Sequence, residues 1–383
     1  MLTLRQKSQF EHDGYLKLEG LLGPDQLDRL DRAIMRAFAD AQTIEGAADV
    51  QYLCGNIIED PELAFIVEHP KVIAAVEILL GGRAYLSQYD IKLRQPGYTD
   101  GEVHYDYKPY RTVGSSLNWL FVMIPLVDYS EQAGPLLVAP GSHRLAEVLQ
   151  GDGRVRHVRL ADSKHVGPVV DPHLRRGDVL LMHMFTWHQA KANRSDHNRY
   201  GLINKYMATD APPAAGPHLY SDAAYAALSD AGKPLLPHHS NRRIATSRLL
   251  VDHHEQVLLV RNSGGRWSLP GGTATEVSDH GNAISSLVLA VDEQLDLTLP
   301  WASYVGDYVE DTELCRVYAY PLESVPDKPL PPSTRWFDVE QLLTEMSPDD
   351  FTCDYEQQAV NTWFRTCALR GVGWPHSGPN TRG

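Results

Sequence analysis

Two segments in the first hundred residues have the hydrophobic spacing of helices. Pro24 opens a stretch in which Leu27, Leu30 and Ile34 fall on one face when they are placed at helical spacing. The apolar run over residues 70–80, which begins with a proline, predicts a second helix. The early part of the chain is therefore expected to be helical.

The pattern changes between Tyr85 and Thr209. Short apolar runs rich in β-branched and aromatic residues alternate with turn clusters such as Gln-Pro-Gly-Tyr-Thr-Asp-Gly and Pro-Gly-Ser-His. Such runs predict strands. Helices followed by strands indicate a mainly β barrel or sandwich with helical cover.

Prolines and glycines divide the chain near residue 240. They are dense between Asp210 and Asn241, where they interrupt helices and strand ladders, so we expect an excursion that ends in a linker. We therefore place one domain at residues 1–240 and a second at 241–370. The tail at 371–383, rich in Gly, Pro, Ser and Asn, has little to bury and is expected to be flexible.

The second domain opens with a predicted hairpin. Apolar runs at 244–251 and 256–261 are joined by Asp-His-His-Glu at 252–255. Farther on, Val288, Val291 and Leu295 recur at helical spacing and predict a helix with one apolar face. Strands and helix together predict a smaller α/β domain.

Composition narrows the functional classes. The chain has 383 residues and a formal net charge of −14, which argues against nucleic-acid binding as its main function. Its longest nearly apolar stretch, residues 117–127, is interrupted by Asn118 and Pro125 and is far shorter than the ~20 residues that span a bilayer. The polar N-terminus lacks the apolar core of a secretory signal. We expect a cytoplasmic protein with no membrane partner.

The cysteines do not indicate a metal or disulfide framework. They lie far apart, without a Cys-x-x-Cys pair, and are expected to be reduced thiols. The four are Cys54, Cys315, Cys353 and Cys367.

The strongest candidate chemistry is a His-x-Asp pair followed by a distant histidine. On a strand, His104 and Asp106 would point to the same side and could present an imidazole and a carboxylate to one ion. His188 ends an apolar strand that follows a Gly-Asp turn. It would complete a ligand set of two histidines and one carboxylate. Such a facial set suits Fe(II) with open positions for a co-substrate and O₂, although zinc with bound water has the same ligand types.

Arg199 supplies a second clue. It lies eleven residues after His188, at the start of another predicted strand. A guanidinium there could bind a carboxylate through two hydrogen bonds, as a dicarboxylic co-substrate would require. Lys92 and Arg94, on a polar strand face before the metal pair, are either carboxylate partners or solvated charges.

Together these motifs resemble the phytanoyl-CoA dioxygenase family of Fe(II)/2-oxoglutarate oxygenases, over roughly residues 8 to 240. The matching segments, in the family's order and spacing, are 10–16 (Phe-Glu-His-Asp-Gly-Tyr-Leu), His104-x-Asp106, 134–144 (Gly-Pro-Leu-Leu-Val-Ala-Pro-Gly-Ser-His-Arg), Gly177-Asp178, His188 and Arg199.

The resemblance implies a jelly-roll domain, or double-stranded β-helix, with a defined site. His104, Asp106 and His188 would bind Fe(II), and Arg199 would hold the distal carboxylate of 2-oxoglutarate. O₂ would convert that co-substrate to succinate and CO₂ while a small-molecule substrate is hydroxylated. One departure is Ala190, where the family often has a small hydroxyl residue that helps hold 2-oxoglutarate.

Other polar and aromatic residues have more ordinary interpretations. His183 is expected to be a hydrogen-bonded core histidine, and His143 a structural residue of a tight turn. Tyr105, Tyr107 and Tyr110 lie around the metal pair and either line a substrate pocket or simply pack.

Residues 241 to 366 resemble the Nudix hydrolase fold. The matching features are the hairpin, the Pro270-Gly271-Gly272 loop and the Trp336-Phe337 strand. The family's catalytic helix is degenerate here, because its Arg-Glu, paired-acid and glycine positions are Leu289-Ala290, Glu293-Gln294 and Asp296. One carboxylate would bind a divalent ion poorly, so we expect no diphosphate hydrolysis unless Glu276, Asp279 or Asp292 substitute as ligands.

The sequence thus predicts an Fe(II)- and 2-oxoglutarate-dependent hydroxylase with a non-catalytic Nudix-like domain. Asp106 disfavours halogenation, because halogenases of this broad class have a small residue in place of the carboxylate. Two alternatives remain open: a binding protein that senses a nucleotide-like ligand through the second domain, and a zinc-dependent hydrolase that uses the same three ligands. The net charge mildly favours a cationic or neutral substrate.

Overall fold

The computed structural model describes most of the chain. The described residues are 2–40, 50–53, 56–106, 119–145, 166–209, 219–236, 244–274, 283–297, 302–310, 312–322, 324–325 and 329–369. They form two compact units, the first with its main part up to Asn241 and the second with its main part from Arg242.

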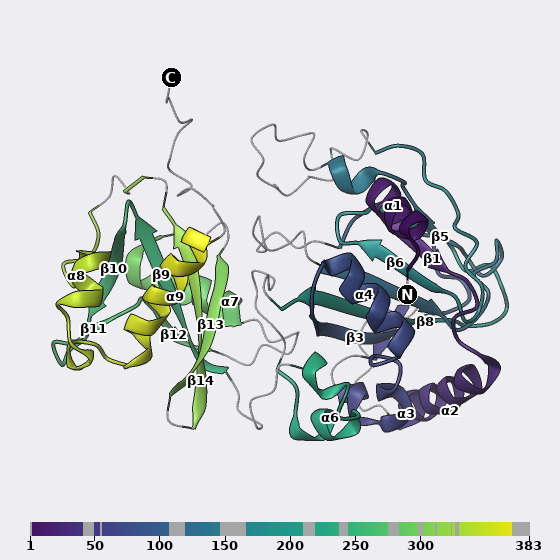
Figure 1. Ribbon diagram of the computed structural model, residues 1–383, viewed down its shortest axis with the longest axis horizontal. Helices are drawn as coiled ribbons and strands as arrows, with labels where there is room; N and C mark the ends of the chain where they lie inside the picture. The colour runs from purple at the N-terminus through teal and green to yellow at the C-terminus, as the bar shows by residue number, and fades with distance from the viewer. Residues whose placement is uncertain are drawn as a thin grey trace. The chain divides into compact units, whose positions relative to one another are not determined.

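The first unit is built on a six-stranded sheet in the order β1-β6-β4-β8-β3-β2 (Figure 1). All neighbours in it are antiparallel. A two-stranded sheet of β5 and β7 completes the unit. The strands are β1 (Tyr15–Leu18), β2 (Val50–Leu53), β3 (Ala84–Arg94), β4 (Trp119–Pro125), β5 (Leu136–Val138), β6 (Val179–His183), β7 (His188–Ala190) and β8 (Arg199–Ala208).

Helices cover one face of the large sheet. Leu30 of α2, Val76 of α4 and Ile91 of β3 share one buried cluster, so this face is the main core. The other face packs on the small sheet, since Phe121 and Met182 cluster with Leu136 and Ala190. The helices are α1 (Leu4–Asp13), α2 (Pro24–Asp40), α3 (Pro61–Ala64), α4 (Pro70–Leu80) and α6 (Asp222–Ala227), with the 3₁₀ turns η1 (Asn56–Glu59), η3 (Ser142–Arg144) and η5 (Lys233–Leu235).

The predicted helices of this unit and its β-rich region are confirmed. Leu27, Leu30 and Ile34 are all buried on α2, and α4 spans the predicted residues 70–80. The β-rich region with helical cover has the two-sheet layout of a sandwich. The expectation of a plain excursion after Asp210 was incomplete, because residues 219–236 form α6 and η5 and bury Leu228 and Leu236 in the first unit's core.

The second unit is a mixed sheet in the order β11-β10-β9-β14-β13, with β12 on β9 and β15 on β10. Strands β9 and β14 are parallel. The α7 residues Leu287, Val291 and Leu295 pack with β9 on one face, and α8 and α9 pack on the other. The elements are β9 (Ile244–His253), β10 (Gln256–Arg261), β11 (Trp267–Ser268), β12 (Gly271–Thr273), α7 (Ala283–Leu295), β13 (Ser303–Glu310), β14 (Glu313–Pro321), β15 (Thr334–Asp338), α8 (Val339–Thr344), η6 (Pro348–Asp350) and α9 (Tyr355–Leu369).

The α/β prediction for this unit is confirmed, with one correction to the hairpin. Strand β9 extends to His253, so the turn contains only His254 and Glu255. Both have positive φ, of 49° and 62°, which fits a tight two-residue hairpin turn. The predicted tail at 371–383 lies outside the described residues. No helix among the described residues is long and apolar enough to cross a membrane.

Candidate metal centre

His104 and His188 lie opposite each other in an isolated antiparallel bridge. The backbone N–H of His104 donates to the carbonyl of His188 at 3.0 Å, and the reverse bond measures 2.7 Å. His104 and Asp106 do not lie on the regular strand from which their shared direction was argued, since His104 is a bridge residue and Asp106 lies in a bend. The bridge nevertheless brings both side chains to His188.

A tight connection between β6 and β7 positions His188. The backbone N–H of Thr186 donates to the carbonyl of His183 at 2.9 Å, and its hydroxyl donates to the carbonyl of Gly14 at 2.7 Å. The N–H of Trp187 donates to the Ser142 hydroxyl oxygen at 2.9 Å. The Phe-Glu-His-Asp-Gly and Pro-Gly-Ser-His motifs therefore support the turn before His188.

Both imidazoles are oriented through Nδ1. In His104 this nitrogen lies 2.8 Å from the carbonyl of Glu102, and in His188 it lies 3.0 Å from the carbonyl of Thr186. A carbonyl only accepts, so each Nδ1 carries a proton, and the nitrogen left to bind a metal through its lone pair is Nε2. This second contact is the usual way in which a protein fixes the tautomer of a ligating histidine.

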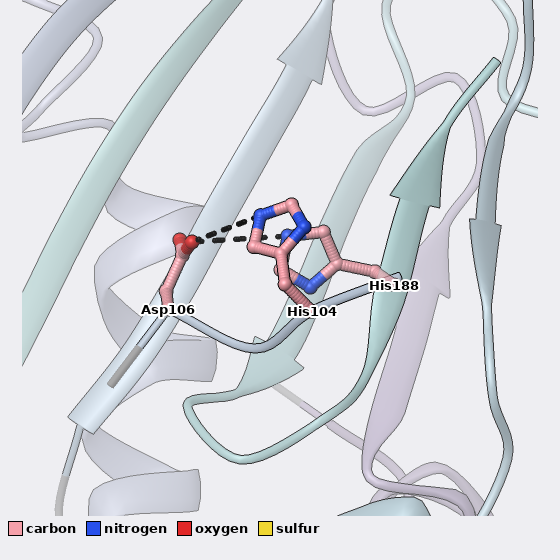
Figure 2. A group of neighbouring side chains, drawn as sticks. All are labelled: His104, Asp106 and His188. Carbon is pink, nitrogen blue, oxygen red and sulfur yellow. Dashed lines mark ion pairs between the residues drawn. The ribbon is translucent and has the colours of Figure 1, made fainter. Parts of the chain in front are cut away.

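The two Nε2 atoms converge on one carboxylate oxygen (Figure 2). Oδ1 of Asp106 lies 3.6 Å from Nε2 of His104 and 3.8 Å from Nε2 of His188. One ligand atom from each of the three residues falls within 4.8 Å of the others, so the group could hold a metal ion. No other such group occurs among the described residues.

Protonation states at this group favour a cation. Burial lowers the pKa of His188 to about 4, so its imidazole is neutral at neutral pH. Burial opposes ionisation of Asp106, but Lys205 and the two histidines outweigh it and hold the pKa of that carboxyl well below its usual range. Nζ of Lys205 lies 3.5 Å from Oδ2 of Asp106, on the side away from the histidines' shared oxygen.

Arg199 begins β8 and is fully buried. Its Nη1 donates to the carbonyl of Gly134, and its guanidinium lies 4.7 Å above the ring of Tyr129. Its Nε and Nη2 atoms are buried and have no hydrogen-bond partner in the described part of the chain. Burial and the neighbouring Arg94 lower the pKa of Arg199 to about 10, so it stays charged at neutral pH.

Arg94 is the direct cross-strand partner of Arg199 on β3. It is also buried, with its Nε unpartnered among the described residues and its guanidinium 4.9 Å above Tyr98. Two buried guanidiniums side by side, both with unused donors, form a site for an anion. The sequence left Arg94 and Lys92 uncommitted, and it did not single out Lys205 or Thr186. For Lys205, the signal was its spacing from Arg199, since alternate residues of a strand share a face.

The remaining residues of the first site keep structural roles. His183 accepts a hydrogen bond from the N–H of Phe185, and its ring is tilted against that of His143 in η3, with centroids 5.1 Å apart. Tyr105 packs against Trp187 with ring centroids 5.1 Å apart, as part of a buried cluster. Tyr107 and Tyr110 lie outside the described residues. Ala190 is buried and offers no hydroxyl.

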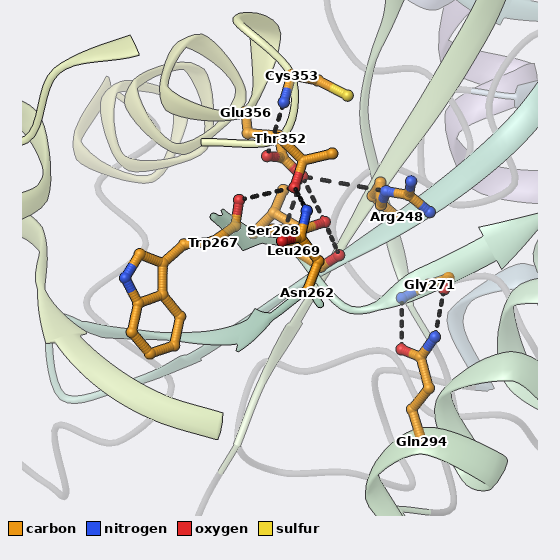
Figure 3. A network of polar contacts seen from close by, with 10 residues as sticks. All are labelled: Arg248, Asn262, Trp267, Ser268, Leu269, Gly271, Gln294, Thr352, Cys353 and Glu356. Atoms are coloured by element: carbon orange, nitrogen blue, oxygen red, sulfur yellow. Dashed lines mark hydrogen bonds and ion pairs between the residues drawn. The ribbon is translucent and has the colours of Figure 1, made fainter. Parts of the chain in front are cut away.

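In the second unit, Gln294 forms two hydrogen bonds with the backbone of Gly271 (Figure 3). Its Oε1 accepts from the N–H at 3.0 Å, and its Nε2 donates to the carbonyl at 2.7 Å. Gly271 cannot carry a side chain, because a Cβ would lie 2.1 Å from the carbonyl oxygen of Ser247. Asp292 and Glu293 are exposed on α7, while Glu276 and Asp279 lie outside the described residues.

A second polar network lies around Glu356, which is fully buried at the start of α9 (Figure 3). Its carboxylate accepts from the Ser268 hydroxyl at 2.8 Å and from the Leu269 N–H at 2.9 Å, and it lies 4.0 Å from Nε of Arg248. The pKa of Glu356 is raised by burial despite these partners. This acid ties α9 to the loop before Gly271. Cys315 and Cys353 form no disulfide among the described residues.

Comparisons with known proteins place the first unit in a family. The chain is 28% identical over 184 residues to an ectoine dioxygenase of Bordetella parapertussis, covering 45% of this chain and 59% of that protein. It is 23% identical over 234 residues to the ectoine dioxygenase of Sphingopyxis alaskensis, covering 54% and 76%. The chain thus spans about three fifths of the length of the Bordetella relative.

Solved structures give a similar picture. A non-heme alpha ketoglutarate dependent carbocyclase, SnoK from nogalamycin biosynthesis, is 26% identical with a TM-score of 0.48, covering 55% of this chain and 86% of that one. EctD from S. alaskensis with bound Fe is 23% identical with a TM-score of 0.46, covering 55% and 78%. Residues 10–201, half of the sequence, match the phytanoyl-CoA dioxygenase (PhyH) family. The chain belongs to that family.

Proposed function

We propose that the first unit is an Fe(II)- and 2-oxoglutarate-dependent dioxygenase that hydroxylates a small-molecule metabolite. The observation that carries the proposal is the convergence of His104, Asp106 and His188, with one ligand atom from each within 4.8 Å of the others. The relatives named as dioxygenases support the same reaction class.

The three residues fit Fe(II). Two imidazole nitrogens and one carboxylate would supply a facial set that leaves positions free for a co-substrate and O₂. Bound Fe(II) would supply the oxidising chemistry that converts 2-oxoglutarate and O₂ to succinate and CO₂ while the substrate is hydroxylated. The chain's own contribution is to hold both Nδ1 atoms as donors to the carbonyls of Glu102 and Thr186, which directs both Nε2 atoms to the metal position.

Arg199 is proposed as the anchor for the distal carboxylate of 2-oxoglutarate. Its Nε and Nη2 are buried donors that a carboxylate would satisfy. Arg94, its cross-strand partner, adds positive charge at the same place. A zinc-dependent hydrolase would use the same three metal ligands but has no need of two buried guanidiniums, so the oxygenase is the better supported function.

For the second unit we propose a Nudix-like fold without hydrolytic activity, in a domain at 241–370 that follows an oxygenase domain at 1–240. Support comes from α7, where Glu293 is exposed and Gln294 is bound to Gly271. Mg²⁺ requires several oxygen ligands in a fixed geometry, which Glu293 and Gln294 do not offer. A nucleotide-like ligand for this unit, and a sensor role built on it, stay predictions.

The test is 2-oxoglutarate turnover by the full chain. Protein loaded anaerobically with Fe(II) should convert 2-oxoglutarate to succinate when O₂ is admitted, and a metabolite panel should include compounds that accelerate it. Zn(II) should not support the reaction, and His188→Ala should abolish it. Absence of 2-oxoglutarate binding in the Fe(II)-loaded protein, or hydrolysis of a panel compound with Zn(II), would contradict the proposal.

A further inference from the structure

The sheet face that bears the candidate metal centre carries four cationic residues. Arg199 and Lys205 lie six positions apart on β8, and Lys92 and Arg94 lie two apart on β3. Even spacing puts each pair on one side of its strand. Ile91, which precedes Lys92 and so points to the other side of β3, belongs to the core on the opposite face, under the helices.

The interactions of the two lysines confirm that they face the metal centre. Nζ of Lys205 is 3.5 Å from Oδ2 of Asp106, and it lies 5.9 Å from the centre of the Phe121 ring. The charge of Lys92 interacts with those of Asp106, Arg199 and Lys205. The Lys205 side chain is only 12% exposed, so its charge is largely removed from water.

The charges at this face do not balance around iron and co-substrate. Of the two carboxylates of 2-oxoglutarate, the distal one would pair with Arg199 and Arg94, and the other would bind the metal. Asp106 would be shared between the metal and Lys205. Among the described residues, the same face of β3 adds one further acid, Asp90, which accepts a hydrogen bond from Gln88. Burial and the neighbouring Arg94 lower the pKa of Lys92 to about 7, so this lysine is only partly charged at neutral pH. Even without it, a divalent ion with Arg94, Arg199 and Lys205 exceeds the negative charge of the co-substrate and the two described acids.

Excess buried charge is costly unless a ligand of opposite sign compensates it. The excess lies beside the reacting centre, because the oxygen that Lys205 approaches belongs to the carboxylate whose other oxygen faces both histidines. An anionic group held by Lys205 would therefore bring its molecule next to the metal. A cationic substrate would meet repulsion there, contrary to the mild preference that the net charge of the whole chain indicated.

We propose that Lys205, assisted by Lys92, is a specificity-determining residue that binds the anionic group, carboxylate or phosphate, of a small-molecule primary substrate. The proposal rests on the oxygenase function proposed above. The proposed role can be distinguished from a purely structural one. If Lys205 only oriented Asp106, its removal would weaken metal binding but leave the affinity for anions unchanged.

The first experiment measures anion binding directly. Full-length protein is loaded anaerobically with Co(II) and saturated with 2-oxoglutarate, then titrated with acetate and separately with inorganic phosphate while the Co(II) absorption is followed. The variants are Lys205→Met, Lys205→Arg and Lys92→Met. Lys233→Met is the matched control, since Lys233 lies on η5 and its Nζ already pairs with Asp230.

We expect at least one of the two anions to bind wild type and Lys233→Met equally, Lys205→Met at least 10-fold more weakly, and Lys205→Arg with intermediate affinity. Whichever anion binds more tightly identifies carboxylate or phosphate as the preferred group. Equal anion affinity in wild type and Lys205→Met, or no anion binding to wild type, would overturn the proposal while leaving the oxygenase intact. Failure of wild type to bind Co(II) or 2-oxoglutarate would remove the oxygenase function and this subsite with it.

A second experiment uses succinate release with metabolites supplied as matched pairs of carboxylic acid and carboxamide, or phosphate ester and free alcohol. The anionic member of a pair should stimulate turnover, with Lys205→Met raising its KM at least 10-fold and changing kcat much less. Stimulation confined to neutral or cationic compounds would contradict the proposal. A loss of kcat and of Co(II) affinity in Lys205→Met without a change in KM would assign Lys205 the structural role instead.

Discussion

His104 and His188 exchange both backbone hydrogen bonds across one isolated bridge, with their ring centroids 4.4 Å apart. Their relative position is therefore set by the main chain, and each side chain needs only its Nδ1 contact to aim Nε2 at the shared space. Because these two side chains are already positioned, a metal ion that binds them has less conformational freedom to remove.

Removal of either imidazole should abolish metal binding. We expect His104→Ala and His188→Ala to lose metal affinity by more than about 100-fold, beyond the range seen when only an outer contact is removed. Calorimetric titration with Co(II) measures this, and turnover should vanish in parallel. His173→Ala, at an exposed histidine, serves as the control. Wild-type affinity in either ligand variant would refute the assignment.

Asp106→Gly tests the carboxylate separately. It should abolish hydroxylation, because the remaining two imidazoles provide no anionic ligand, and it leaves a position that chloride could take. Product analysis by mass spectrometry, with and without chloride, gives the outcome. Hydroxylation at the wild-type rate would mean that another carboxylate binds the metal.

Arg199→Ala should weaken 2-oxoglutarate binding while metal binding stays nearly unchanged. A charge-assisted pair of this kind contributes about 1.5–3 kcal/mol, which corresponds to a rise in Kd of roughly 10- to 150-fold. The measurement is 2-oxoglutarate titration of the Co(II) protein, with the exposed Arg194→Ala as control. Unchanged co-substrate affinity would shift the anchor to Arg94 or Lys92.

Part of this site was predictable because its signals are local in the sequence. The spacing of His104, Asp106, His188 and Arg199 needed no knowledge of how the strands pair. The pairing of Arg94 with Arg199 depends on the register of β3 and β8, which cannot be inferred from the spacing of residues along either strand alone. For the same reason the contact of Lys205 with Asp106 was not foreseen. The bridge at His104 could not be predicted either, because a single bridge has no periodic sequence pattern.

Gly14→Ala should be strongly destabilising for a steric reason. Gly14 has φ of 76°, and a Cβ there would lie 2.4 Å from Nδ1 of His143 and 2.7 Å from the hydroxyl oxygen of Thr186. We expect a loss of about 2–4 kcal/mol, combining backbone strain and overpacking. Gly81→Ala is the matched control, because Gly81 has the same φ with open space around it. Denaturant unfolding measures both, and equal losses would show that the contact with Thr186 is unimportant.

Asp252 predicts a pH dependence in the second unit. It is fully buried, its Oδ2 accepts from Nε1 of Trp363 at 2.7 Å, and burial raises its pKa to about 6. Because the folded state holds this proton more tightly than the unfolded state, its stabilising contribution is complete below about pH 4 and is lost as pH rises to about 6. The total is about 3 kcal/mol.

Thermal unfolding between pH 4 and 7 tests this. Asp252→Asn removes the titrating group. The loss of stability between pH 4 and pH 7 should therefore be smaller in this variant than in wild type, by the contribution of one carboxyl group. Parallel profiles for the two proteins would show that Asp252 ionises normally.

The second unit should hydrolyse no nucleoside diphosphate derivative. Phosphate-release assays with dinucleotides, nucleotide sugars and ADP-ribose, in Mg²⁺ or Mn²⁺, should give no turnover, and Glu293→Gln should leave the oxygenase reaction intact. Gln294→Ala should instead cost about 1–3 kcal/mol of stability, since it removes two hydrogen bonds to Gly271. Hydrolysis that disappears in Glu293→Gln would show that the degenerate helix is still catalytic.

The bridge between His104 and His188 also affects the thermal stability of the first unit. A metal ion held there would join two segments that are distant in sequence, and so act as a removable cross-link within the first unit. Ligand linkage adds about 2.7 kcal/mol of stability when free metal reaches 100 times its Kd. Chelation should therefore lower the melting temperature of the first unit while the transition of the second unit stays in place, so that the two units report separately on metal supply.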